Sequence, residues 1–155
     1  MPGIILTEKP YIDAQTIMHY NGIRNKRTLR KEPDMKPESS VIFFPCKNLA
    51  ETIEYYTAVV GLTVYKKLDD LVWFDCGYGY LAFVQYGADR PMATGECISF
   101  NLPTIEDVDA MYEKLLARPV IGLRGAPAHH PRFPVYSFFF SDPNGYTLEF
   151  QRTTD

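Results

Sequence analysis

The stretch VIFFPCKNL at residues 41–49 recurs in outline 56 residues later as CISFNLPTI at residues 97–105. In both copies, a run of residues typical of a β-strand leads to a residue that suits a helix N-cap, Asn48 in the first copy and Thr104 in the second. Apolar residues at helical spacing follow each cap. The chain therefore contains a duplicated strand–helix unit, and a cleft between the two copies is the natural place for a ligand site.

Each strand–helix unit is followed by further strand candidates separated by turn residues. These apolar runs lie near residues 62–65, 71–74 and 80–85 after the first unit, and near residues 120–123, 136–140 and 146–151 after the second. The segment from Arg124 to Pro134 is expected to be irregular, and residues 142–145, DPNG, predict a type I turn. The sequence thus predicts an α+β fold of two βαβββ modules.

The composition is that of an ordinary folded protein. The chain has 155 residues, of which 46% are hydrophobic, and a formal net charge of -3, so no overall field favours nucleic acid or a membrane surface. No apolar run approaches the roughly 20 residues of a membrane helix, and no signal peptide is recognised. The three cysteines, Cys46, Cys76 and Cys97, lack CxxC spacing and are expected to be reduced, mostly buried thiols. We therefore expect a cytoplasmic protein.

Two regions are distinguished along the chain. Residues 1–39 lie outside the repeat and are expected to form an N-terminal arm and linker. A short helix is predicted at residues 14–24, next to a basic set that is interpreted as a solvated surface because no groove-reading motif accompanies it. Residues 40–151 are expected to form the main domain, with module one at 40–87 and module two at 96–151.

Short motifs occur in a fixed order along the main domain. They are Asn48-Leu49, Tyr55-Tyr56, Val60-Gly61-Leu62 and the ending FSDPNGYTLEF at residues 140–150. Together with the two modules, they resemble the vicinal oxygen chelate superfamily, which includes glyoxalase I, extradiol dioxygenases, fosfomycin-resistance enzymes and bleomycin-resistance proteins. The resemblance covers about residues 40–151. It implies a curved eight-stranded mixed sheet around a cleft, usually completed by a homodimer that can exchange modules between subunits.

The resemblance also indicates where a metal is held in members that use one. The four ligand positions correspond here to Val41, Ala82, Cys97 and Glu149. Val41 and Ala82 have no donor atom in their side chains, and a catalytic divalent metal generally needs about three protein ligands. We therefore expect no metal cofactor at these positions.

Strand alternation sorts the side chains into one face under the helices and one face lining the cleft. Ile42 and Phe44 are among those expected under the helices. The cleft set combines aromatic, hydrogen-bonding and acidic groups: Phe43, Trp73, Tyr80, Cys97, Ser99, Asn101 and Glu149. The sequence does not show whether Trp73 or Phe74 faces the cleft, because residues 72–74 show no alternation of polar and apolar side chains.

These residues suit a small aromatic or cationic ligand. Phe43, Trp73 and Tyr80 would stack on it, while Glu149 would anchor its polar end or, in an enzyme, accept a proton. We favour a non-enzymatic binding protein similar to the bleomycin-resistance type, forming a homodimer.

Two other functions stay open at this point. One is a lyase, isomerase or dioxygenase whose divalent metal is held by Glu149, Cys97 and one of the loop histidines His129 and His130. The other is a non-catalytic interaction domain. Cys97 is interpreted as a small apolar residue rather than a nucleophile.

Overall fold

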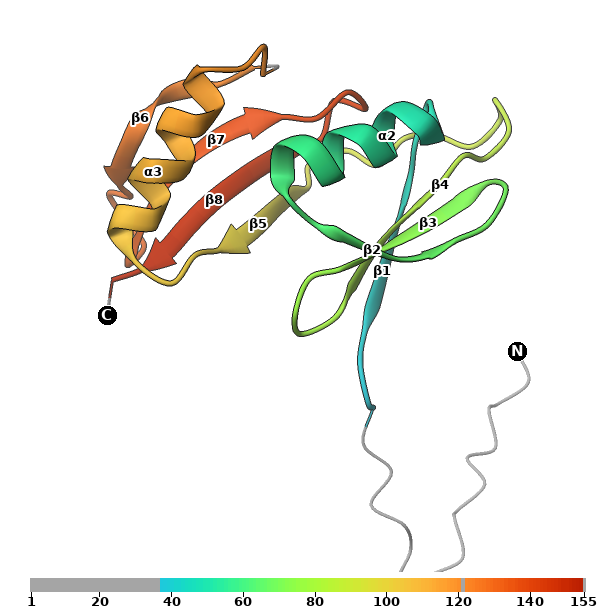
Figure 1. Ribbon diagram of the computed structural model, residues 1–155, viewed down its shortest axis with the longest axis horizontal. Helices are drawn as coiled ribbons and strands as arrows, with labels where there is room; N and C mark the ends of the chain where they lie inside the picture. The colour runs from blue at the N-terminus through green and yellow to red at the C-terminus, as the bar shows by residue number, and fades with distance from the viewer. Residues whose placement is uncertain (1–36, 121, 155) are drawn as a thin grey trace, which may run out of the picture. The chain divides into compact units, whose positions relative to one another are not determined.

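The structure is a computed structural model that describes residues 37–120 and 122–154 (Figure 1). These residues belong to one compact unit, Pro37–Asp155. The helix expected at residues 14–24, the neighbouring basic set and His19 lie outside the described residues. Within the described part, no helix is long and apolar enough to cross a lipid bilayer.

Module one is a βαβββ unit whose helix ends in one π-helical turn. Its elements are β1 (Val41–Pro45), α2 (Leu49–Tyr55), η1 (Tyr56–Val60), β2 (Thr63–Lys67), β3 (Leu71–Asp75) and β4 (Tyr80–Val84). The strand order is β1-β4-β3-β2, with β1 parallel to β4 and the other neighbours antiparallel. Strand β1 is therefore an edge of this sheet.

Module two repeats the arrangement. Its elements are β5 (Cys97–Asn101), α3 (Ile105–Leu116), β6 (Arg124–His129), β7 (Val135–Ser141) and β8 (Thr147–Thr153). The strand order is β5-β8-β7-β6, again with one parallel pair at the edge, and α3 packs on one face of this sheet (Figure 1). The predicted α+β fold of two βαβββ modules is confirmed, with the eight strands divided equally between two sheets.

Both helices begin at the predicted caps. The Asn48 side chain accepts a hydrogen bond from the Glu51 amide at 3.1 Å, and Thr104 forms a reciprocal capping box with Asp107. The first helix closes with a bond from the Gly61 amide to the Tyr56 carbonyl at 3.0 Å, which is an i to i−5 bond. Gly61 has φ 90°, a conformation that favours glycine and ends the helix.

One strand differs from its prediction. Strand β6 occupies Arg124–His129, inside the segment that was expected to be irregular. A strand was expected near residues 120–123, but the described residues of that range, 120, 122 and 123, form none. Pairing with β7 sets Arg124 opposite Phe139 and Ala128 opposite Ser137, with an irregularity between them. Backbone pairing to a well-formed neighbour thus overrides the weak strand propensity of this segment.

The cores lie on the helix-covered faces of the sheets. Phe74 and Phe83 are fully buried in module one, so Trp73 lies on the opposite face and the choice between Trp73 and Phe74 is settled. Ile42 was expected under the helix but is 59% exposed. The reason is that α2 packs on the inner strands β3 and β4, whereas Ile42 is on the edge strand β1.

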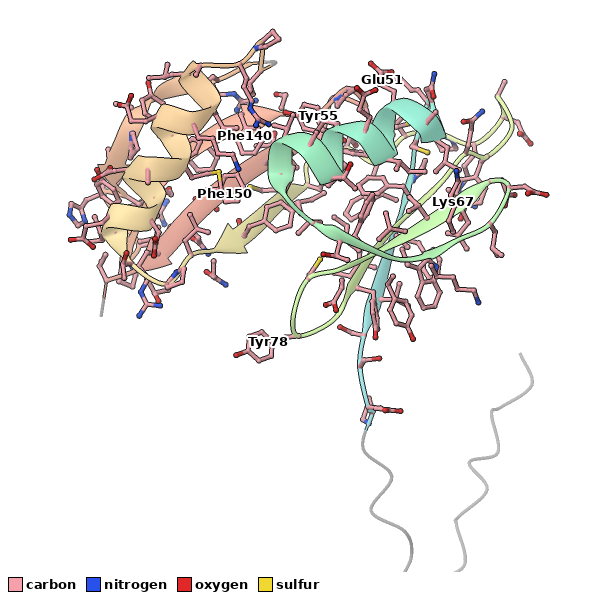
Figure 2. All side chains as sticks on the ribbon, viewed as in Figure 1. Glu51, Tyr55, Lys67, Tyr78, Phe140 and Phe150 are labelled. Carbon is pink, nitrogen blue, oxygen red and sulfur yellow. The ribbon has the colours of Figure 1, made fainter. Side chains whose placement is uncertain are left out.

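The predicted turn at residues 142–145 joins β7 to β8, and hydrogen bonds at this turn link module two to module one. The Gly145 amide donates to the Asp142 carbonyl at 3.0 Å, as a type I turn requires. The buried Asp142 carboxylate accepts from the Tyr56 hydroxyl at 3.1 Å, and the Tyr146 hydroxyl donates to the Pro45 carbonyl at 2.7 Å. The labelled Tyr55 of α2 donates to the backbone carbonyl at the end of β7 (Figure 2). The junction is therefore a network of buried polar bonds.

The junction tyrosines predict sensitivity to alkali. Burial, with the charge of Asp142 adding to it, raises the pKa of Tyr55 and Tyr56, and burial raises the pKa of Tyr146 to about 12. The native state thus holds these protons to higher pH than the unfolded chain, whose tyrosines titrate near 10. The stability that Tyr146 contributes is complete below about pH 10 and is lost as the pH rises toward 12.

Urea unfolding at about pH 8 and about pH 11 measures this loss. We expect a lower free energy of unfolding at the higher pH and a smaller difference in Tyr146→Phe, because phenylalanine cannot ionise. Equal pH dependence in the wild type and Tyr146→Phe would contradict the assignment to Tyr146.

Candidate functional site

Four aromatic rings gather on the uncovered face of module one. The ring centroids of Phe43 and Trp73 are 5.7 Å apart, those of Trp73 and Tyr80 are 5.8 Å apart, and those of Tyr65 and Tyr80 are 4.5 Å apart. Strand pairing causes this gathering, since Phe43 lies opposite Ala82 and Ala82 lies opposite Trp73. The small Ala82 side chain leaves room between the larger ones. We call Phe43, Tyr65, Trp73 and Tyr80 the aromatic cluster.

A cavity of about 510 Å³ adjoins the aromatic cluster. Tyr65, Trp73 and Tyr80 line it together with the acidic residues Glu38 and Asp75 and the hairpin at residues 77–79. Hydrogen bonding with Tyr65 raises the pKa of Tyr80, and partial burial and the two carboxylates add to this effect. The Tyr80 hydroxyl therefore stays protonated at neutral pH.

The indole nitrogen of Trp73 is unusual within this cluster. Nε1 is buried and has no hydrogen-bond partner among the described residues. A buried donor normally has a partner, so an acceptor from outside the described residues would satisfy it. Lys66 Nζ lies over the Trp73 ring, 5.8 Å from the ring centroid.

Polar side chains occupy the uncovered face of module two. Ser99 on β5 lies opposite Glu149 on β8, and its hydroxyl donates to Glu149 Oε2. Cys97 Sγ is 3.7 Å from Ser99 Oγ, and Gln151 Nε2 donates to Asn101 Oδ1 at 3.0 Å. Cys97, Ser99, Asn101 and Glu149 therefore share one face, which we call the polar face.

Glu149 is 7% exposed and has no ion pair among the described residues. Arg152, the nearest arginine in sequence, lies opposite Tyr136, whose hydroxyl bonds to Asp109 of α3, so Arg152 projects from the helix side of the sheet. Arg132 instead stacks on Phe133 in the loop before β7. Within residues 37–120 and 122–154, Glu149 is thus held by the Ser99 hydroxyl and can still accept a bond from a ligand.

The cysteines differ from their prediction. Only Cys46 is buried, while Cys76 and Cys97 are exposed, and all three are free thiols. Partial burial raises the pKa of the Cys97 thiol, and the hydrogen bond with Ser99 lowers this pKa. The negative charge of Glu149 raises the pKa of Cys97, whereas the positive charge of Arg124 lowers it. A thiol with a raised pKa is a poor nucleophile at neutral pH, so Cys97 serves the polar face as a neutral group.

The two loop histidines do not join Glu149. His129 lies opposite Tyr136 and shares the helix side of the sheet with it. His130 Nδ1 accepts bonds from the amides of Arg132 and Phe133, both at 3.1 Å, and so stabilises its own loop. Across residues 37–120 and 122–154, no group of three or more His, Cys, Asp or Glu side chains could hold a metal ion. The donors present do not fit the four-position metal site that the resemblance implies, because Val41 and Ala82 have no donor atom in their side chains.

The predicted site residues form two sets rather than one. Among the described residues, no hydrogen bond or ring contact joins the aromatic cluster to Glu149. Between the modules there is instead an apolar groove of about 530 Å³ with Ile42, Leu81, Ile98 and Phe100 in its lining. Tyr78 also lines the groove, from the tip of the hairpin after β3 (Figure 2).

Sequence reasoning did not select Tyr65 or Lys66. The pairing of β2 with β3 shifts register between Val64 and Lys66, so simple alternation could not place either side chain. Their aromatic and basic character near Trp73 was the only available signal.

Residues 40–150 match the model of the Glyoxalase/Bleomycin resistance protein/Dioxygenase superfamily. The chain belongs to this superfamily. No curated protein matches it. The motifs that resemble the superfamily therefore indicated the correct group.

Solved structures of this superfamily have the same fold. A glyoxalase/bleomycin resistance protein/dioxygenase from Nocardioides is 17% identical, with 92% of this chain and 95% of that chain covered and a TM-score of 0.62. Lactoylglutathione lyase from Agrobacterium tumefaciens is 21% identical, with coverages of 76% and 96% and a TM-score of 0.61. The fosfomycin resistance protein FosX from Listeria monocytogenes is 18% identical, with coverages of 77% and 96% and a TM-score of 0.62. At these identities the likeness establishes the fold alone.

Proposed function

We propose that this chain is a cytoplasmic protein that binds a small organic molecule, aromatic or cationic, in its cleft without a metal. The observation that carries the proposal is the aromatic cluster, whose rings lie on an uncovered sheet face beside a cavity of about 510 Å³. Such a surface suits a flat ring or a cation. The buried but unpartnered Trp73 Nε1 supports a ligand or partner at this place.

The residues have separate roles in this proposal. Phe43, Trp73 and Tyr80 stack on the flat part of the ligand. Glu149, held by Ser99, anchors its polar end, and Cys97 and Asn101 complete the polar face. Binding would be driven mainly by removal of apolar surface from water, with the polar bonds setting orientation.

The donor set supports a ligand site without a metal. Val41 and Ala82 lack donor atoms, and the Glu149 carboxylate is already bonded by a hydroxyl. A rebuilt set with His129 is not assembled, because that side chain lies on the other face of the sheet. Two donors are fewer than a divalent metal usually needs for catalysis.

We further propose that a second copy of the chain completes the cleft. Both β1 and β5 are edge strands, and Ile42 and Phe43 on β1 are 59% and 47% exposed. Pairing of these edges between copies would cover the apolar side chains and bring an aromatic cluster close to a polar face. Light scattering measures the mass directly, and a monomer at micromolar concentration would reject this arrangement.

Metal analysis of purified, untagged protein after dialysis tests the metal-free part of the proposal. Zinc, nickel, manganese and iron are then added back, and the melting temperature is followed in the wild type and Glu149→Ala. We expect no stoichiometric metal and no shift on addition. Stoichiometric metal that raises the melting temperature, and is lost in Glu149→Ala, would reject the proposal in favour of a metal enzyme.

A further inference from the structure

One row of side chains crosses the uncovered face of module two, with a residue from each strand. Strand pairing sets Ser99 opposite Glu149, Glu149 opposite Phe139, and Phe139 opposite Arg124. Directly opposed residues in paired strands project from the same face. Phe138, the neighbour of Phe139 along β7, is buried on the face packed by α3. The row therefore faces away from the helix and toward a ligand.

Arg124 is the available positive charge in this row. Its side chain is exposed and forms no ion pair with a carboxylate of residues 37–120 and 122–154. It is also near enough to Cys97 to oppose the burial that raises the pKa of that thiol. Glu149, in contrast, is buried and already bonded to Ser99. The row thus offers an unpaired cation, a flat phenyl ring and an acceptor.

The matching row of module one has a different character. It runs from Phe43 through Ala82 and Trp73 to Lys66. The cation of this row, Lys66, is already in contact with the Trp73 ring. Ala82 takes the position that Glu149 has in module two. The side chain that is free to bind an anionic group of a ligand is therefore Arg124 in module two.

We propose that Arg124 binds the carboxylate of a flat aromatic ligand whose opposite end donates a hydrogen bond to Glu149. This inference rests on the proposed function and names its ligand class, a hydroxy- or amino-substituted aromatic carboxylate. A guanidinium binds a carboxylate through two parallel hydrogen bonds. Arg124 and Glu149 are two strands apart, about 10 Å between backbones, so one face of the ligand ring lies over Phe139 and the other face is left for the aromatic cluster of the proposed second copy.

Three matched probes differ only in the charge of one end. They are 6-hydroxy-2-naphthoate, 6-hydroxy-2-naphthamide and 6-(aminomethyl)-2-naphthol, with binding measured by isothermal titration calorimetry. We expect the wild type to bind the carboxylate about 10-fold more tightly than the amide. Arg124→Gln should remove this preference, while Arg124→Lys should keep part of it as a point charge. Arg90→Gln is the control, because Arg90 stacks on Tyr86 outside both rows.

The outcomes separate this inference from the proposed function. A carboxylate preference that survives in Arg124→Gln, or that is lost instead in Lys66→Gln, overturns the role of Arg124 while the aromatic site stands. Tightest binding of the aminomethyl probe also overturns it. Absence of binding to all three probes contradicts the proposed function itself, because the flat apolar part is common to them. Arg124 is exposed, so its variants should fold, and circular dichroism verifies that they do.

Discussion

Asp142→Ala is expected to lower the free energy of unfolding by at least about 3 kcal/mol. The carboxylate is 1% exposed and accepts four hydrogen bonds, from the amides of Asn144 and Tyr146, the Asn144 side chain and the Tyr56 hydroxyl. Alanine would leave the two amides and the Tyr56 hydroxyl without these partners, while Asn144 Nδ2 would keep only its bond to Thr52 Oγ1 at 3.1 Å. An unsatisfied buried donor costs more than the bond itself contributes. Urea unfolding followed by far-UV circular dichroism measures the change.

Asp109→Ala provides the matched control for this variant. Asp109 is exposed on α3 and accepts a single bond, from the Tyr136 hydroxyl at 2.8 Å, so its loss should cost less than about 1 kcal/mol. Equal losses in the two variants would show that the junction is not a major source of stability. Tyr56→Phe removes one of the four bonds to Asp142 and should have an intermediate effect.

The fold could be predicted because its decisive signals are local. The caps Asn48 and Thr104 and the turn at residues 142–145 each require particular residue types within four positions, and the structure has all three as expected. Strand β6 could not be predicted in the same way. Its backbone is held by β7, and pairing to a partner strand leaves little trace in the composition of the strand itself.

The facing of the candidate site residues was predicted in part, and the omissions have a common cause. Alternation correctly put Phe43 and Tyr80 on one uncovered face and Ser99 and Glu149 on another. The residues that were missed lie on the edge strands β2 and β6, where the pairing changes register after Val64 and after Arg124. A change of register breaks the two-residue period on which a prediction of facing depends.

The exposure of Ile42 has a similar origin. Its parity is the one expected for the helix side, but a short helix covers only the inner strands of a four-stranded sheet. Alternation along a strand predicts the face from which a side chain projects, but it does not predict whether another element covers that side chain. Coverage depends on the length and position of the helix, and here it leaves an apolar groove beside β1.

Trp73→Ala is expected to weaken binding of 6-hydroxy-2-naphthoate about 10- to 100-fold, since stacking on one aromatic side chain contributes about 1–3 kcal/mol. Trp73 also contacts the rings of Phe43, Tyr65 and Tyr80, so its removal loosens the whole surface on which a flat ligand would lie. The side chain is only partly buried and lies outside the hydrophobic core, so the fold should persist. Calorimetry measures the affinity, and circular dichroism verifies the fold.

Phe133→Ala tests whether the effect is particular to the aromatic cluster. Phe133 is 57% exposed and stacks on His130 at a ring distance of 4.6 Å, so it is a surface ring in a stacked pair, but it lies in the loop before β7. We expect its removal to leave the affinity unchanged. If Trp73→Ala likewise has no effect while the probe still binds, the flat ring does not stack on the aromatic cluster. The apolar groove is then the next place to test, because Ile42→Lys would put a charge into its lining and should abolish binding there but not at the aromatic cluster.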